Sequence, residues 1–145
     1  MNAKAFYDSI RSYLQLTSQL VSQVGNQINV GEKFTLRFTG SNSCPAEWIG
    51  WWKEPDIVFD CPRIMVRGTL FAEPVTGEKW HNLPSQMLYP GESSYVDIEF
   101  EAKQSFQLPW IPEMVAKAWI RADLNQDKFF RVWNFTEAYV QIEET

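Results

Sequence analysis

The chain has 145 residues and a formal net charge of −5, with 45% apolar and 21% charged residues. This length suits a single domain with its own hydrophobic core, and the composition is that of an ordered globular protein rather than a disordered one. The Lys and Arg residues are scattered, which argues against a nucleic-acid-binding protein, and no apolar run reaches the roughly 18 residues of a membrane-spanning helix.

Residues 3–24 have the apolar spacing of an amphipathic helix, and Gly25 follows where helices commonly stop. We therefore expect an N-terminal amphipathic helix over residues 1–25 and a β-domain over residues 26–145. The apolar stripe either packs on its own domain or contacts a protein partner or a second copy of the chain. Its candidate contact residues are Phe6, Ile10, Leu14 and Val21.

After Gly25 the apolar spacing changes to the alternation typical of half-buried strands. Turn-forming residues separate most of these runs, and no helical pattern intervenes, which predicts an antiparallel β-sandwich. Trp119 and Trp133 alternate with small or apolar neighbours, so an outward orientation would make that face of the sheet aromatic. The predicted strands are Lys33–Thr39, Ile64–Phe71, Tyr95–Glu101, Met114–Ala122, Phe129–Trp133 and Ala138–Ile142.

Between Glu47 and Cys61 the chain reads E-W-I-G-W-W-K-E-P-D-I-V-F-D-C. A long connection between strands is usually functional or disordered, and this one is too aromatic to be disordered. Three roles stay open for Trp48, Trp51 and Trp52. They plug an open end of the sandwich, anchor a protein–protein contact, or stack on a glycan.

Two cysteines, Cys44 and Cys61, flank this Trp-rich loop. A disulfide between them would close a loop of about 18 residues and contribute roughly 3 kcal/mol in the chain-entropy model. The N-terminus lacks the continuous apolar stretch of a secretory signal, which favours a cytoplasmic protein. Two thiols in a reducing compartment are therefore favoured over the disulfide.

The sequence contains no recognisable catalytic or metal-binding motif. His81 is the single histidine, no Ser or Cys stands in a nucleophile context, and no glycine-rich phosphate loop is present. The spacing of His81 from the two cysteines is not that of a zinc site. Residues 123–127 lack the glycine and glutamate of a calcium loop and are expected to form a turn. We expect no catalytic residues, no metal and no cofactor.

Several segments, in order, resemble a bacterial immunoglobulin-like module. They are V-G-E-K-F-T-L-R-F-T-G-S-N, L-P-S-Q-M-L-Y-P-G-E-S-S-Y-V-D-I-E-F, V-A-K-A-W-I-R-A-D-L-N-Q-D and A-Y-V-Q-I. Together they resemble CARDB-type domains, the cell-adhesion-related sandwiches of bacterial surface proteins, and less closely the tryptophan-bearing sandwich of autophagy receptors. The resemblance covers roughly Gly31 to Ile142. It implies an all-β, immunoglobulin-like sandwich of about seven strands that binds or spaces rather than catalyses.

These observations predict a non-catalytic protein-interaction or structural adaptor module. It would assemble with a protein partner, or with itself as an oligomer, through the N-terminal helix and the Trp-rich loop. The alternative is a carbohydrate-binding module that uses Trp48, Trp51 and Trp52 as a stacking platform. Nucleic-acid binding and membrane insertion are not expected.

Overall fold

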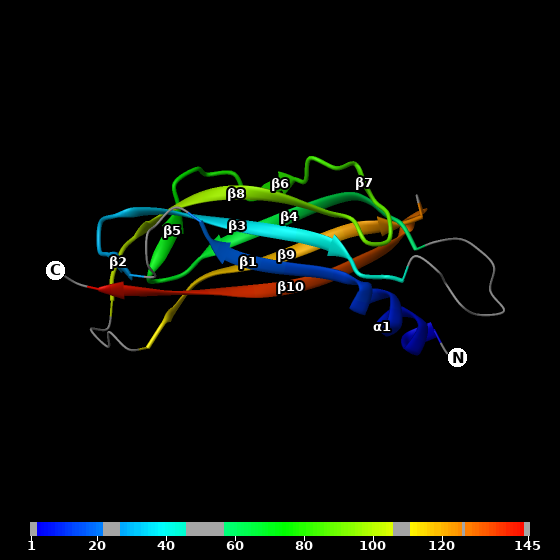
Figure 1. Cartoon of the computed structure of the whole chain (residues 1–145), viewed down its shortest axis with the longest axis horizontal. Helices are drawn as coiled ribbons and strands as arrows, with labels where there is room; N and C mark the ends of the chain where they lie inside the picture. Colours follow the sequence, from blue (N-terminus) through cyan, green and yellow to red (C-terminus); the bar gives the residue numbers. More distant parts are fainter. Residues whose placement is uncertain (1–2, 22–26, 46–56, 106–110, 126, 144–145) are drawn as a thin grey trace.

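The structure, a computed structural model, describes residues 3–21, 27–45, 57–105, 111–125 and 127–143. These residues form one helix and ten strands arranged as two facing sheets (Figure 1). In chain order the elements are α1 (Ala3–Tyr13), β1 (Leu14–Leu20), β2 (Gln27–Asn29), β3 (Lys33–Asn42), β4 (Phe59–Gly68), β5 (Ala72–Pro74), β6 (Trp80–Asn82), β7 (Met87–Leu88), β8 (Ser93–Ala102), β9 (Glu113–Leu124) and β10 (Asp127–Glu143).

The two sheets confirm the predicted all-β sandwich, although the described residues form ten strands where about seven were expected. One sheet has four strands in the order β1-β3-β8-β5. The other has the order β2-β10-β9-β4-β6, and β7 also pairs with β4. All pairings are antiparallel except that of β2, which adds in parallel to the end of β10.

The core lies between the sheets, and alternation along the strands produces it. In β3 every second residue from Phe34 to Asn42 is buried, and the residues between them face outward. Phe34 and Phe100 stack with ring centres 5.7 Å apart, and Phe38 lies 6.4 Å from Phe100. Because aromatic pairs add to the stabilisation from buried area, this cluster fixes β3 against β8.

The predicted helix over residues 3–24 is wrong in its second half. The helix ends at Tyr13, and the chain passes directly into β1, which pairs with β3 from Leu14 opposite Asn42 to Leu20 opposite Leu36. Leu14 and Leu16 alternate with exposed residues, and this period of two competes with the helical spacing. The ladder to β3 decides the outcome, because tertiary pairing readily overrides weak helix propensity.

Strand β1 therefore belongs to the sandwich, although the predicted boundary at Gly25 placed it with the helix. Residues 22–26 lie outside the described residues. Within the part of the chain that the structure describes, no helix is long and apolar enough to cross a membrane.

The two predicted strands over residues 129–133 and 138–142 are parts of one long strand, β10. The apolar alternation breaks at Asn134, whose side chain points inward and donates a hydrogen bond to the Leu14 carbonyl, 2.8 Å away. This bond ties the first strand of one sheet to the longest strand of the other. Because this inward position is polar, the apolar alternation is interrupted, and the sequence pattern predicts two strands where there is one.

Two of the turns that separate the strands have the same geometry. Gly31 and Gly91 both have left-handed backbone angles, φ 92° and 86°. In each turn the following glutamate accepts a hydrogen bond from a backbone N–H three residues earlier, Glu32 from Asn29 and Glu92 from Tyr89. Glycine adopts this conformation without steric strain, which explains its place in both turns.

Candidate functional site

The tryptophans of the predicted loop contact, Trp48, Trp51 and Trp52, lie outside the described residues. Their role stays a prediction. The structure does describe both ends of the loop, which are held by the buried side chain of Asn42. Its amide donates to the carbonyls of Ile57 and Leu88, at 2.6 and 2.9 Å, and its oxygen accepts from the N–H of Cys44 at 3.0 Å.

The predicted contact stripe on the N-terminal segment needs correction. Ile10 and Leu14 are only 1% and 0% exposed and belong to the hydrophobic core of their own chain, so they cannot contact a partner. Val21 is 37% exposed at the end of β1. The side chain of Phe6 lies outside the described residues. Ile10 and Leu14 are therefore wrong as contact residues because their side chains complete the core of their own chain, whereas the roles of Phe6 and Val21 stay predictions.

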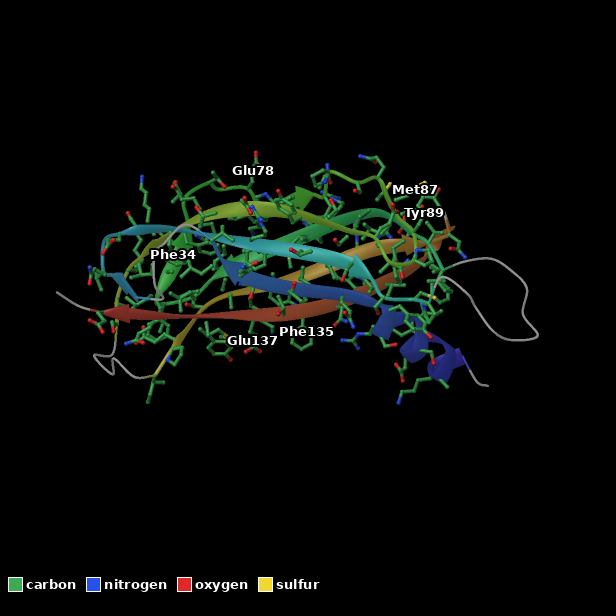
Figure 2. All side chains as sticks on the ribbon, in the orientation of Figure 1. Phe34, Glu78, Met87, Tyr89, Phe135 and Glu137 are labelled. Atoms are coloured by element: carbon green, nitrogen blue, oxygen red, sulfur yellow. The ribbon has the colours of Figure 1, made fainter. Side chains whose placement is uncertain are left out.

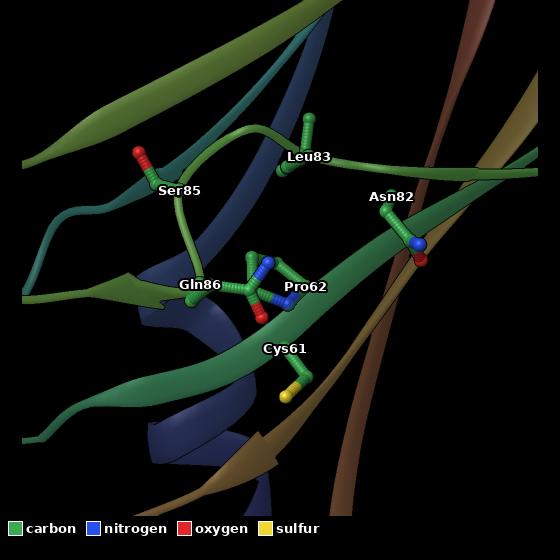
Figure 3. A pocket seen from close by; sticks show the side chains of 6 residues that line it. All are labelled: Cys61, Pro62, Asn82, Leu83, Ser85 and Gln86. Carbon is green, nitrogen blue, oxygen red and sulfur yellow. The ribbon is translucent and has the colours of Figure 1, made fainter.

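No disulfide joins Cys44 and Cys61. The Cys44 thiol is buried and the Cys61 thiol is exposed. Cys61 has a left-handed backbone conformation, φ 47°, and lies at a small hollow of about 160 Å³ (Figure 3). The other residues that line this hollow are Pro62, Asn82, Leu83, Ser85 and Gln86.

The single histidine, His81, lies on the short strand β6 opposite Ile64 of β4. Its Nε2 atom is buried and has no hydrogen-bond partner among the described residues. Among those residues, no group of three or more His, Cys, Asp or Glu side chains is placed to hold a metal ion.

The outer side of the six-stranded sheet carries an array of cations and aromatic rings. In β9, the small or apolar residues Ala118, Ile120 and Ala122 are buried, and the residues between them face outward. Phe135 and Glu137 of β10, labelled in Figure 2, are directly opposite Trp119 and Lys117 of β9 and so belong to the same side of the sheet. We call this surface the Arg–Trp face. It consists of Arg63, Met65, Arg67, Trp80, Lys117, Trp119, Arg121, Trp133 and Phe135.

One end of the Arg–Trp face is a column of interleaved guanidinium groups and indole rings. The Arg63 and Arg121 guanidinium carbons each lie 4.9 Å from the centre of the Trp80 ring. Arg121 also lies 5.6 Å from the centre of the Trp133 ring, and the two tryptophans meet edge to face at 6.1 Å. Such cation–π contacts hold long side chains in fixed positions and occupy ring faces.

At the middle of the face, the ammonium nitrogen of Lys117 lies 5.3 Å from the centre of the Trp119 ring and 5.0 Å from that of Phe135. Trp119 is directly opposite both Met65 of β4 and Phe135 of β10. A row of apolar side chains therefore crosses the sheet at this level, and Phe135 at its end is 46% exposed.

Like charges stand directly opposite each other across β4 and β9. Arg63 faces Arg121, and Arg67 faces Lys117. Opposed like charges destabilise a sheet, and none of these four cations has an ion pair within the described residues. An arrangement of opposed like charges that lowers the stability of the free chain is suited to receive an anionic group.

The pKa of Arg121 is lowered, first by partial burial and then by the neighbouring positive charges of Arg131 and Arg63. Asp123 opposes this shift and forms an ion pair with Arg131 at 3.6 Å. The Nε atom of Arg63 is buried without a hydrogen-bond partner among the described residues. This end of the face is therefore electropositive and holds an unused hydrogen-bond donor.

None of the Arg–Trp face residues was among the candidate site residues predicted from the sequence. The alternation K-A-W-I-R-A does predict Lys117, Trp119 and Arg121 on one side of a strand, but it does not indicate that they form a binding surface. The contribution of Trp80 has no such signal, because β6 is only three residues long.

No protein-family model matches the chain, and no curated protein matches it. Among solved structures, it is similar to a cohesin module of a family 33 glycoside hydrolase from Clostridium perfringens, with a TM-score of 0.44 and 10% identity, covering 90% of this chain and 98% of that one. It is also similar to AvmM, which catalyses macrocyclization in alchivemycin A biosynthesis (TM-score 0.41, 13% identity, 92% and 90% covered). A third is the sporulation control protein Spo0M from Bacillus subtilis (TM-score 0.40, 8% identity, 90% and 49% covered). Similarity at this level says nothing about what the chain binds.

Proposed function

We propose that this chain is a non-catalytic interaction module that binds a protein partner through its Arg–Trp face. The observation that carries the proposal is the set of four cations without ion pairs, packed among aromatic rings on one side of a sheet. Trp and Arg are enriched among the residues that dominate protein–protein binding energies. The resemblance to CARDB-type domains, which bind or space rather than catalyse, points the same way.

Carbohydrate binding is less well supported on this face. A sugar ring needs a free aromatic face to stack on, whereas Arg63 and Arg121 contact Trp80, Arg121 contacts Trp133, and Lys117 contacts Trp119. A nucleic acid would use the same free ring faces for base stacking and would meet a chain of net charge −5. The tryptophans of the loop remain part of the proposal as a second contact region.

The test compares proteins that co-purify with three immobilised forms of the chain: wild type, Arg121→Glu and Lys33→Glu. Lys33 lies on β3 in the four-stranded sheet, so Lys33→Glu makes the same charge change away from the Arg–Trp face. We expect at least one protein to be retained by wild type and by Lys33→Glu and to fall by about tenfold or more with Arg121→Glu, as for a central interface arginine.

Quantitative mass spectrometry of the retained proteins provides the readout, and circular dichroism checks that each variant is folded. Equal retention of every protein by all three forms would contradict the proposal. Loss of a concentration-dependent dimer with Arg121→Glu, measured by sedimentation, would identify a second copy of the chain as the protein partner.

A further inference from the structure

We infer that the Arg–Trp face receives an extended peptide segment with two carboxylate side chains four residues apart and an apolar side chain midway between them. This inference rests on the proposed function and names the chemistry of the partner. It follows from the spacing of the cations and from the apolar row between them.

The four cations form two rows across β4 and β9. One row is Arg63 opposite Arg121, and the other is Arg67 opposite Lys117. Along each strand the two rows are four residues apart, which corresponds to about 13 Å at 3.3 Å per residue. Within a row the two strands are about 5 Å apart. The backbone positions of the two rows are therefore separated by roughly the length of four extended residues, and the Lys117 ammonium leans from its row toward the middle one, 5.3 Å from the centre of the Trp119 ring.

An extended peptide has the same period as the strands beneath it. Its residues i, i+2 and i+4 project to one side, and i and i+4 are about 13 Å apart. A segment running along β4 and β9 can therefore place one carboxylate at each cation row. Its residue i+2 then lies above the middle row, where Met65 and Trp119 supply an apolar contact.

Carboxylates fit the donors that the column leaves available. The guanidinium groups of Arg63 and Arg121 both lie over the ring of Trp80, and the N–H groups of a guanidinium lie in its own plane. A planar carboxylate accepts two such N–H bonds side by side.

The two rows differ in strength. The Arg63–Arg121 row has two guanidinium groups, each able to bind a carboxylate through two N–H bonds, and its neighbour Arg131 is paired with Asp123 at 3.6 Å. The Arg67–Lys117 row has Glu137 directly opposite Lys117, and the Glu137 carboxylate accepts a hydrogen bond from the Tyr139 hydroxyl at 2.6 Å. The first row is therefore expected to contribute more of the attraction for an anionic side chain.

The experiment uses two fluorescently labelled synthetic peptides of identical composition. One has glutamates at i and i+4 with leucine at i+2, separated by serine and threonine, and its isomer has the two glutamates adjacent. Binding to the full chain is followed by fluorescence anisotropy at low ionic strength, where charge attraction is least screened. We expect the spaced peptide to bind at least about fivefold more tightly, because only it reaches both cation rows.

Substitutions test whether the spaced peptide binds at the Arg–Trp face. Arg63→Gln/Arg121→Gln is expected to weaken binding of the spaced peptide by about tenfold or more, and Arg67→Gln by less, whereas Lys33→Gln leaves it unchanged. Thermal unfolding confirms that each variant is folded. Equal affinity for the two isomers, or equal binding by the double variant, would overturn the inference.

A sulfated polysaccharide, heparin, and single-stranded DNA serve as rival probes. Tighter binding of either one than of the spaced peptide, abolished by the double variant, would assign the face to that class of polymer and overturn the inference. The proposed function fails on a different result, namely unchanged retention of proteins by Arg121→Glu. The two failures can therefore be told apart.

Discussion

Asn42 is a polar side chain in the hydrophobic core, only 1% exposed, and it connects three separate segments. Its side chain bonds to the backbone at Ile57, Leu88 and Cys44. Its own backbone N–H donates to the Glu92 carbonyl, and its carbonyl accepts from Gly91. Removing a buried polar group that bonds several backbone groups lowers the free energy of unfolding considerably, because each partner is left without a hydrogen bond.

We predict that Asn42→Leu, which has nearly the same volume, lowers the free energy of unfolding by about 3 kcal/mol, since two carbonyls and one N–H lose their partner. Urea denaturation measures the change. The exposed Asn82 provides the control, and Asn82→Leu is expected to stay within about 0.5 kcal/mol of wild type. A similarly small effect of Asn42→Leu would show that water replaces the lost bonds.

The ion pair between Arg37 and Asp97 predicts a pH dependence. Two hydrogen bonds, of 2.8 and 3.0 Å, join the side chains, and the Arg37 guanidinium lowers the pKa of Asp97. A carboxyl whose pKa is lower in the folded state stabilises the fold above its unfolded pKa of about 3.9, and this contribution is lost as the pH falls through the folded value.

Accordingly, Asp97→Asn should melt below wild type at pH 7, by a small amount because the pair is largely exposed. The difference in melting temperature should shrink below about pH 3.9 and vanish once Asp97 is protonated in the folded state. Thermal melts from pH 2 to 7 provide the measurement. A difference that persists at pH 2 would assign the effect to packing.

At the scale of elements, the junction between α1 and β1 shows where the helical pattern misleads. Ile10 of the helix is buried in the core, Tyr13 packs against it, and Leu14 continues the same buried surface from the strand. Ile10 and Leu14 both lie on the apolar spacing that predicts a long helix, because a helix followed by a strand can place apolar residues at similar intervals. The segment therefore completes its own domain.

We predict that Ile10→Ala lowers the free energy of unfolding by about 2–4 kcal/mol through loss of buried contacts and the cavity left behind. The exposed Val21 on the same predicted stripe is the matched control, and Val21→Ala should change stability by less than about 0.5 kcal/mol. Chemical denaturation of the two variants is the measurement. Equal, small effects would restore the interpretation of the stripe as an outward surface.

Regular alternation made most of the sandwich predictable. The pattern in residues 114–122 predicts a strand with Lys117, Trp119 and Arg121 on one face, and the structure confirms this. What joins Arg121 to Trp80, however, is the pairing of β6 with β4 and of β4 with β9. A three-residue strand has no periodicity of its own, and cross-strand neighbours depend on a register that one sequence does not reveal. The column was therefore beyond prediction.

At the scale of the whole molecule, charge is distributed unevenly between the two sheets. On the four-stranded side, Arg37 pairs with Asp97, and Lys103 pairs with both Glu73 and Glu101. On the Arg–Trp face, two rows of opposed cations have no such partners among the described residues. Natural proteins accept reduced stability at binding sites, where residues are selected for recognition rather than for the fold.

This asymmetry predicts that Arg67→Glu stabilises the free chain. The change replaces repulsion between Arg67 and Lys117 with an attraction, which is worth about 0.2–1 kcal/mol for a cross-strand pair. Urea denaturation should show the gain, which high salt should reduce. Arg37→Glu is the control and should lower stability, because it places a second acid opposite Asp97. Loss of stability in Arg67→Glu would contradict the repulsion.

Because one thiol is exposed and the other is buried, their rates of chemical labelling can report on local opening of the structure. Alkylating reagents reach Cys61 in the native state, whereas Cys44 lies beneath the anchorage made by Asn42 and reacts only when that anchorage opens. The ratio of the two labelling rates, measured by mass spectrometry, therefore reports how often the contact between Asn42 and Cys44 opens. A partner that binds the segment next to Cys44 would slow the labelling of Cys44 and leave the labelling of Cys61 unchanged.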